Sequence, residues 1–197
     1  MLEARKLSRL TLGPVDLSLE AGEVVALRGA SGSGKTLLMR ALADLDPCRG
    51  DVLLDDVERR AFFAPDWRKA VAWVPAEAGW WSDTVIEHFT DWQVALPLIE
   101  ELGLSPDCGG WQVSRASTGE RQRLALVRAI SQQPKVLLLD EPTSGLDRQS
   151  VAQVETLIAR LAGAGASVLW TTHDEDQAAR VASRALLIEN GKLAAAA

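Results

Sequence analysis

Eight residues near the start of the chain constrain its fold more than any other segment. They fit the pattern G-x-x-x-x-G-K-S/T and read Gly29-Ala30-Ser31-Gly32-Ser33-Gly34-Lys35-Thr36. An apolar run precedes them and a helical pattern follows. Glycine lets such a loop curl until successive N–H groups point inward, and the helix N-terminus adds partial positive charge. A glycine-rich turn that binds nothing is the alternative, but the strand–loop–helix context favours a phosphate-binding loop in an α/β domain.

Apolar runs and helical patterns alternate along most of the 197 residues. Strands are predicted at Val24–Leu27, Val52–Leu54, Val71–Val74, Val136–Leu139, Val168–Thr172 and Ala185–Ile188. Helices are predicted at Lys35–Ala43, Glu120–Ser131, Gln149–Leu161 and Glu175–Ala182, with a turn at Asn190-Gly191 and a frayed end at Ala194–Ala197. Runs that are apolar at every position are typical of strands covered on both faces. The pattern therefore predicts a single α/β domain over residues 1–197, with a mostly parallel sheet flanked by helices.

Residues 77–115 interrupt this alternation. The segment has no strand pattern but has helix-length patterns at Val85–Phe89 and Asp91–Leu102, and it holds Trp80, Trp81, Trp92 and Trp111. We expect a small helical subdomain inserted into the α/β domain. Pro106, Gly109 and Gly110 are expected to mark the return of the chain to the sheet.

Charge and composition exclude several classes of protein. The net charge is −6 and no basic block is present, which argues against a nucleic-acid partner. The longest stretch without Asp, Glu, Lys or Arg, Leu161–His173, is shorter than the roughly 20 residues that a membrane-spanning helix needs. Two cysteines sixty positions apart, Cys48 and Cys108, indicate a reducing compartment. With only two histidines besides, at no ligand spacing, a zinc site is not expected.

Two carboxylates follow the apolar strand at Val136–Leu139. Carboxyl ends of parallel strands form the ligand crevice of open α/β sheets, so Asp140 is expected to hold Mg²⁺ beside the phosphate loop. Glu141 is placed to orient and deprotonate a water that attacks the γ-phosphate. Lys35 would reach the β- and γ-phosphates, and the Thr36 hydroxyl would be a second Mg²⁺ ligand. Two solvated carboxylates in a turn are the alternative interpretation.

Three further motifs complete an ordered set. They are Ser117-Thr118-Gly119-Glu120, Ser144-Gly145-Leu146-Asp147 and Thr172-His173-Asp174. With the phosphate loop and Asp140-Glu141 they resemble, in order and spacing, the ATP-binding cassette of ABC transporters, from about Leu2 to Lys192. The resemblance implies a P-loop NTPase fold, ATP and Mg²⁺ as cofactors, and an ATPase subunit that powers a separate transmembrane permease.

The resemblance also implies a mechanism. Two chains would form a head-to-tail homodimer on binding ATP, so that Ser117, Thr118, Gly119 and Glu120 act in trans on the partner's γ-phosphate. Asp147 would cross to the facing subunit. His173 would contact the γ-phosphate and hold the geometry of Glu141 and its water. The chain would lie at the cytoplasmic face of the plasma membrane through its permease, and be soluble when isolated.

Departures from the family pattern mark the positions that need testing. In the family's signature motif, which corresponds to Ser117-Thr118-Gly119-Glu120 here, Thr118 stands where glycine is usual. In the family's Q-loop, which follows the strand at Val71–Val74, Ala76 stands where glutamine is expected, so that Glu77 would serve as an acidic substitute. Residues 1–28 hold no aromatic side chain to stack on adenine. Either Leu10 or the Arg9 guanidinium covers the base or nothing does, and we expect weak discrimination between ATP and GTP.

Other functions stay open at this point. Ala76, Thr118 and the missing aromatic are compatible with a clamp that binds ATP and hardly hydrolyses it. A soluble ABC ATPase acting on chromosomes or ribosomes is the third possibility, although the chain has neither a long coiled coil nor a second cassette. A switch GTPase is excluded, because Asn190 is the sole asparagine and no N-K-x-D is present.

The family further implies that the helical insertion receives the permease. We expect Trp80 and Trp81 to face that partner while Trp92 and Trp111 pack inside; the alternative is that these tryptophans build the small core of the insertion. The short insertion is also similar to that of small bacterial exporter ATPases.

Overall fold

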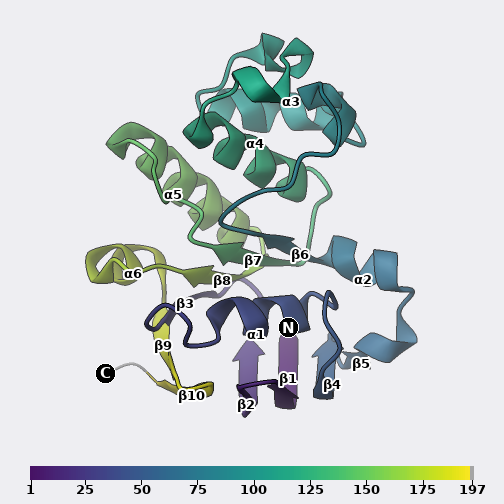
Figure 1. Ribbon diagram of the computed structural model, residues 1–197, viewed down its shortest axis with the longest axis vertical. Coiled ribbons are helices and arrows are strands. Elements are labelled where there is room, and N and C mark those ends of the chain that lie inside the picture. Colours follow the sequence, from purple (N-terminus) through teal and green to yellow (C-terminus); the bar gives the residue numbers. More distant parts are fainter. Residues whose placement is uncertain (196–197) are drawn as a thin grey trace.

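A mixed six-stranded sheet carries most of the predicted strands. The computed structural model describes residues 1–195 (Figure 1). The strand order is β10-β9-β3-β8-β7-β6, and all strands run parallel except β10. Their bounds are β3 (Val24–Arg28), β6 (Val71–Val74), β7 (Val136–Asp140), β8 (Ser167–Thr171), β9 (Arg184–Glu189) and β10 (Lys192–Ala195). The predicted α/β class with a mostly parallel main sheet is confirmed.

A second, antiparallel sheet was not predicted. Its order is β2-β1-β4-β5, formed by β1 (Leu2–Arg9), β2 (Leu12–Leu19), β4 (Arg49–Leu54) and β5 (Val57–Glu58). Helix α1 (Lys35–Leu42) lies between the two sheets (Figure 1). Its buried side chains Leu38, Met39 and Leu42 belong to one core with strands of both sheets. This arrangement fixes the start of α1, and with it the phosphate loop.

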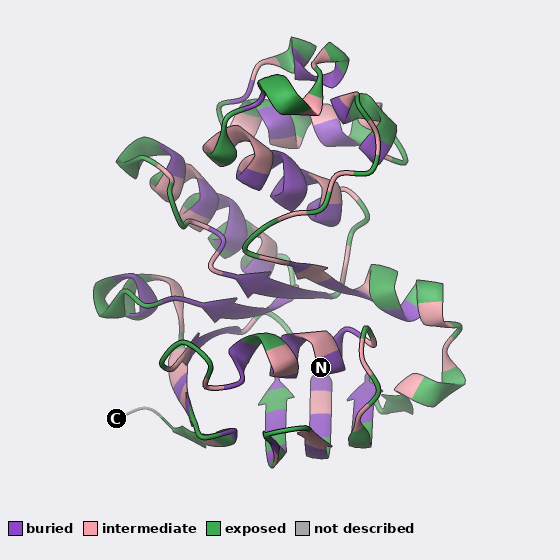
Figure 2. Cartoon of the chain, in the orientation of Figure 1, coloured by how far each residue is buried: buried purple, intermediate pink, exposed green. Residues whose placement is uncertain are grey.

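A second core covers the other face of the parallel sheet. It is built with α3 (Trp92–Glu101), α4 (Thr118–Ile130) and α5 (Arg148–Gly163). Strand β7 shows the division: Val136 and Leu138 join the first core, whereas Leu137 and Leu139 join the second. Alternate side chains of a strand point to opposite faces, so a strand between two cores is apolar at every position. Figure 2 shows the resulting band of buried residues through β7 and β8.

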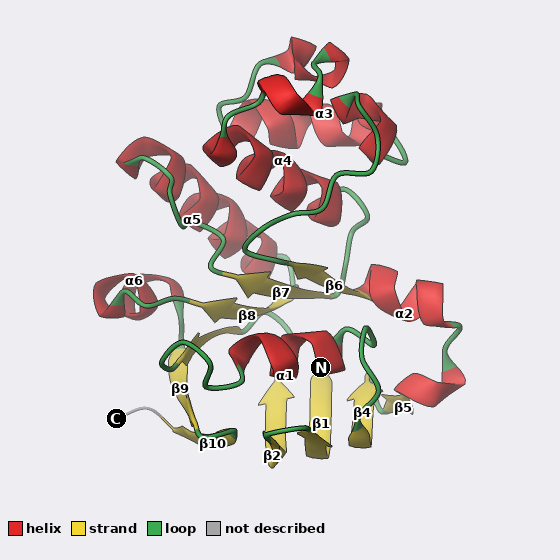
Figure 3. Ribbon diagram, in the orientation of Figure 1, coloured by secondary structure: helices red, strands yellow, loops and turns green. Residues whose placement is uncertain are grey.

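The segment 77–115 contains helical turns and no named strand. After β6 the chain forms a 3-10 turn at Val85–His88, then α3, then 3-10 turns at Pro106–Gly110 and Val113–Arg115 (Figure 3). The expectation that Pro106, Gly109 and Gly110 return the chain to the sheet was wrong. They lie in a 3-10 turn, and the chain continues into α4 before it reaches β7. Side chains of this segment belong to the second core, so the segment packs against the rest of the domain without forming a strand.

The four tryptophans of this segment differ in exposure. The Trp81 side chain is 69% exposed, whereas Trp80, Trp92 and Trp111 are half-buried and pack against the second core. The guanidinium of Arg128 lies 4.9 Å from the ring centroids of both Trp80 and Trp81. Trp81 is thus the indole most available to a partner.

Several elements escaped the sequence analysis. The strands β1, β2, β5 and β10 and the short helix α2 (Ala64–Ala70) were not predicted, and Val52–Leu54 belongs to the antiparallel sheet. The frayed end was wrong for Ala194 and Ala195, which pair with β9 in β10; Ala196 and Ala197 lie outside the described residues. The predicted helices are present with ends shifted by one or two residues, and Asn190-Gly191 forms the β9–β10 turn. Within residues 1–195, no helix is both long and apolar enough to cross a bilayer.

Candidate nucleotide site

The positively charged side chain of Lys35 is buried within the phosphate loop. The Lys35 side chain is in the first turn of α1, only 7% of the residue is exposed, and its Nζ donates to the carbonyls of Gly29 (2.7 Å) and Ala30 (3.0 Å). Among residues 1–195 no carboxylate lies within ion-pair distance of this ammonium. A buried charge is costly unless it is paired, so the loop is suited to an anionic ligand.

The β9–β10 hairpin supports the loop from behind. The backbone N–H of Gly191 donates to the carbonyl of Ser33 (3.2 Å). Gly29 has φ 150°, and a Cβ there would lie 2.4 Å from the carbonyl oxygen of Ile188, so only glycine fits. The Ser33 hydroxyl is buried without a hydrogen-bond partner among the described residues. This hydroxyl lies on the hairpin side of the loop, 2.7 Å from the position that a Cβ at Gly29 would take.

Asp140 connects the phosphate loop to the end of the sheet. Its Oδ2 accepts from the Thr36 hydroxyl (2.9 Å), and its Oδ1 accepts from the Thr171 hydroxyl (2.9 Å). The Thr171 oxygen also accepts the backbone N–H of Glu141 (2.8 Å). Thr171 was missed in the sequence analysis. The signal available was a polar residue at the end of an otherwise apolar strand, paired with Asp140 in the register of β7 and β8.

Glu141 and His173 meet although 32 positions separate them. The Oε1 of Glu141 lies 2.5 Å from the Nε2 of His173. Glu141 has a positive φ of 49°, which is uncommon for a residue with a side chain, and its N–H is held by Thr171. The backbone at the end of β7 is therefore fixed in the conformation that turns the Glu141 carboxylate towards His173.

One cavity of about 310 Å³ unites these groups. Ser31, Gly32, Gly34, Lys35, Thr36, Leu37, Ala76, Asp140, Glu141 and His173 line it. Ala76 thus faces the cavity where the family has its Q-loop glutamine. Glu77 is exposed and is not a lining residue, so its role as an acidic substitute gains no support.

The signature residues lie outside this cavity. Ser117 is the N-cap of α4, where its Oγ accepts from the backbone N–H of Glu120 (3.3 Å) and donates to the Glu120 carboxylate (2.7 Å). The Ser117 backbone N–H also donates to that carboxylate (2.8 Å), and the two bonds that Ser117 donates hold the pKa of Glu120 below its usual range. Ser117 and Thr118 are exposed, and Gly119 is half-exposed. A capped helix N-terminus is therefore presented to the surroundings instead of to the chain's own phosphate loop.

Asp147 is also an exposed N-cap. Its carboxylate accepts the backbone N–H (3.0 Å) and the hydroxyl (2.8 Å) of Ser150 at the start of α5. These hydrogen bonds lower the pKa of Asp147. Its helix-capping contacts are thus present whatever role it has towards a partner.

The two side chains expected to cover the base differ in how firmly other residues hold them. The Arg9 guanidinium donates to the carbonyl of Pro47 (2.6 Å) and lies 3.5 Å from Asp46. Leu10, at the β1–β2 turn, is 83% exposed. Of the two, Leu10 has the side chain that is free to move onto a base.

Comparisons with known proteins agree with this geometry. The family model described as "ABC transporter" matches residues 12–144. The aliphatic sulfonates import ATP-binding protein of Pseudomonas syringae pv. syringae is 36% identical over 94% of this chain and 70% of its own length. The phosphonates import ATP-binding protein of Nostoc sp. is 34% identical over 95% and 85%. These relatives are import proteins, so the similarity to small exporter ATPases gains no support from them.

Solved structures share the fold. The ATP-binding subunit of an ABC transporter superposes with a TM-score of 0.87 at 23% identity, covering 98% of this chain and 89% of the other. A dimeric ATP-binding cassette in a post-hydrolysis state, bound to ADP and Pi, gives 0.79 at 22% identity and covers 98% and 96%. Together with the family match and the named relatives, these findings show that the chain belongs to the ABC transporter family, as an ATP-binding and ATP-hydrolysing subunit.

Proposed function

We propose that two copies of this chain enclose two molecules of ATP and hydrolyse them to drive a separate membrane permease. The observation that carries the proposal is the Lys35 ammonium, which is buried against the carbonyls of Gly29 and Ala30 without a carboxylate partner in residues 1–195. The β- and γ-phosphates of ATP supply the missing negative charge. The N-terminus of α1 adds to the attraction.

Thr36 and Asp140 suit Mg²⁺. Their Oγ1 and Oδ2 atoms lie 2.9 Å apart at the cavity and are the hard oxygen donors that Mg²⁺ prefers. In this proposal the two residues hold Mg²⁺, which neutralises charge on the β- and γ-phosphates when it is bound. The proposal needs no other metal.

Glu141 and His173 perform the chemistry. Glu141 orients a water and accepts its proton as the water oxygen bonds to the γ-phosphorus and the bond to the bridging oxygen of ADP breaks. His173 keeps the carboxylate in place through the 2.5 Å contact and faces the γ-phosphate from the cavity wall. Lys35 stabilises the charge that develops on the phosphate oxygens.

A second copy of the chain completes the site. Ser117, Thr118, Gly119 and Glu120 lie outside the cavity of their own chain, which supports their acting on the ATP of a partner. The exposed N-terminus of α4 offers backbone N–H groups and a helix dipole to that anion. Asp147 is proposed to reach the facing subunit at the same interface.

Residues 77–115 are proposed to form the helical subdomain that contacts the permease, within one domain spanning residues 1–197. The exposed Trp81 beside Trp80 supports a contact there, because a rigid aromatic side chain removes much area from water. Through this contact the chain would be peripheral at the cytoplasmic side of the membrane. The named relatives support import as the direction. Unimpaired permease binding after Trp80→Ser and Trp81→Ser together would refute this surface.

A clamp with little hydrolysis is the second candidate. The observation in its favour is Ala76, an apolar residue in the cavity wall where the family has glutamine. Thr118 in the signature points the same way. The two candidates differ only in turnover, so kinetics distinguishes them.

The test is ATP hydrolysis per chain as a function of chain concentration, with Glu141→Gln beside it. A rate per chain that rises with concentration and is lost in Glu141→Gln supports a two-subunit site with Glu141 as base. A rate per chain that stays constant would refute the site in trans. ATP binding without hydrolysis, both alone and with the permease in lipid, would favour the clamp.

A further inference from the structure

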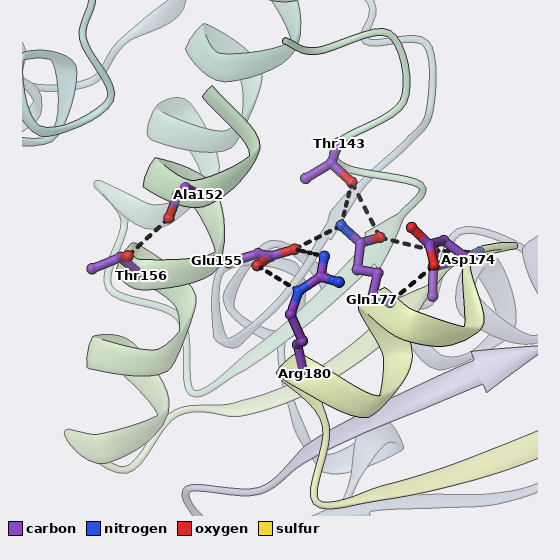
Figure 4. A network of polar contacts seen from close by, with 8 residues as sticks. Thr143, Ala152, Glu155, Thr156, Asp174, Gln177 and Arg180 are labelled. Atoms are coloured by element: carbon purple, nitrogen blue, oxygen red, sulfur yellow. Dashed lines mark hydrogen bonds and ion pairs between the residues drawn. The ribbon is translucent and has the colours of Figure 1, made fainter. Parts of the chain in front are cut away.

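A buried amide outside the nucleotide cavity joins three segments of the chain. Gln177, in α6 (Glu175–Val181), is 5% exposed. Its Nε2 donates to Glu155 Oε1 in α5 (3.0 Å) and to the Thr143 hydroxyl (3.0 Å), and its Oε1 accepts from the Thr172 hydroxyl (2.8 Å). Figure 4 shows the Gln177 side chain between Thr143, Glu155 and Asp174. None of the proposed chemical steps uses this residue.

The orientation of the amide follows from its partners. An ionised carboxylate only accepts hydrogen bonds, so Glu155 requires the NH₂ group of Gln177 on its side. Arg180 also donates to Glu155 (3.0 Å), which holds that carboxylate in place. The amide oxygen must then face Thr172. A side chain at position 177 therefore needs one donor and one acceptor in fixed directions.

Both threonines lie next to the proposed chemical groups. Thr143 is two positions after Glu141 in the loop that follows β7, and Thr172 directly precedes His173 after β8. The Glu141 and His173 side chains contact each other, and within residues 1–195 neither has another side-chain hydrogen bond. Their alignment thus depends on how the two loops are held.

Packing alone does not hold these loops. A second cavity, of about 270 Å³, borders the same pair from another side and is lined by Glu141, Thr143, Thr172, His173 and Gln177 among others. A side chain that borders a cavity lacks contact atoms on that side. Hydrogen bonds in a buried setting add to the restraint: the Thr171 hydroxyl holds the backbone of Glu141, and Gln177 is the side chain that bonds to Thr143 and Thr172, one in each loop.

The geometry points to Gln177 as the positioning residue that aligns Glu141 with His173 for hydrolysis, an inference that rests on the proposed roles of those two residues. While Glu155 is its neighbour, an amide is required at this position. Methionine would leave Glu155, Thr143 and Thr172 without their partner, and glutamate would place a buried carboxylate against the half-buried carboxylate of Glu155. Gln177 acts through the two loops and touches no substrate.

The first test does not depend on turnover. The chain has two histidines, so the Cε1–H resonances of His173 and His88 are readily assigned by NMR. In nucleotide-free Gln177→Met we expect the His173 resonance to move towards its position in Glu141→Ala, while that of His88 stays. His88 is an internal reference because it is buried and bonded within the helical segment. Thr156→Ala is the matched control on α5, since its exposed hydroxyl bonds only to Ala152 (Figure 4).

The second test separates positioning from folding. In Gln177→Met we expect kcat to fall about 10- to 100-fold with little change in ATP affinity. Glu155→Gln added to Gln177→Glu exchanges acid and amide, and should restore the His173 resonance and kcat towards wild type. If Gln177→Met does not fold, the comparison of this double variant with Gln177→Glu still tests the positioning role of Gln177.

The outcomes separate this inference from the proposed function. A folded Gln177→Met with a wild-type His173 resonance and kcat would overturn the positioning role. So would a double variant no better than Gln177→Glu. Hydrolysis that survives Glu141→Gln would instead refute the proposed function.

Discussion

The hydroxyl of Thr171 offers the sharpest test of how the site is built. It accepts the N–H of Glu141 and donates to Asp140, and Thr171 is fully buried. Thr171→Val keeps the shape and the β-branched side chain but removes both hydrogen bonds. An orphaned buried donor costs about 1–3 kcal/mol and a lost bond to a charged group about 1.5–3 kcal/mol. Because the two losses share one atom and water reaches Asp140 from the cavity, we expect about 3 kcal/mol of destabilisation in total.

For a domain of this size, that loss lowers Tm by roughly 6–12 °C. The lost free energy of unfolding is measured by urea unfolding followed by tryptophan fluorescence. The comparison holds provided that m, the slope of that free energy against urea concentration, is unchanged. Thr171→Ser is the matched control, since it keeps the hydroxyl and loses one buried methyl, worth about 1 kcal/mol. The kcat for ATP should fall in Thr171→Val and be largely retained in Thr171→Ser, because Glu141 loses the contact that fixes its backbone. Equal stability and equal kcat of the two variants would refute the reasoning.

Three further predictions follow from single groups. Hydrogen bonds from Ser117 lower the pKa of Glu120, so its contribution to stability is present above the carboxyl pKa of the unfolded chain and is lost as the pH falls below about 4. In Glu120→Gln, Tm should therefore fall less steeply between pH 5 and 3 than in wild type (roughly one carboxyl titration), and parallel curves would contradict this. Burial raises the pKa of the Cys108 thiol to about 11, whereas Cys48 is half-exposed. Ellman's reagent at pH 8 should titrate one thiol in the native chain and two in denaturant; two fast thiols in the native state would be the contrary result. Because Leu10 replaces an aromatic stack, ATP and GTP should bind within about tenfold of each other, and Leu10→Trp should tighten ATP by about 1 kcal/mol. If the wild-type chain bound ATP much more tightly than GTP, the interpretation that Leu10 takes the place of an aromatic stack on the base would be refuted.

Local sequence patterns predicted the parallel sheet and the residues around the cavity. The phosphate loop directly follows β3 and the Asp140-Glu141 pair lies at the end of β7, so a motif and its structural setting can be read together. The antiparallel sheet was missed for a physical reason. In β1 the register shifts between Ala4 and Leu7, which breaks the simple alternation of buried and exposed residues that reveals a strand. This reason does not cover β2, where buried and exposed residues alternate from Val15 to Leu19 and offered a signal that was overlooked.

The supporting contacts of the site were beyond sequence patterns. Thr171 meets Asp140 because β7 and β8 pair in one register, and Gln177 meets Thr143 and Glu155 because α6 packs against two other segments. Such contacts depend on where whole elements lie relative to one another. No spacing within a motif encodes them, so the sequence indicated which groups gather at the cavity but not what holds them in place.

The contact between the phosphate loop and the β9–β10 turn has a consequence for biosynthesis. The loop lies within the first 36 residues, but the N–H that closes on Ser33 belongs to Gly191. A ribosome-bound chain thus emerges with its loop sequence early, but the support of that loop can form only after residue 191 has been made. Contacts between such distant positions form late in folding. A product that stops before residue 191 would therefore lack this support of its phosphate loop.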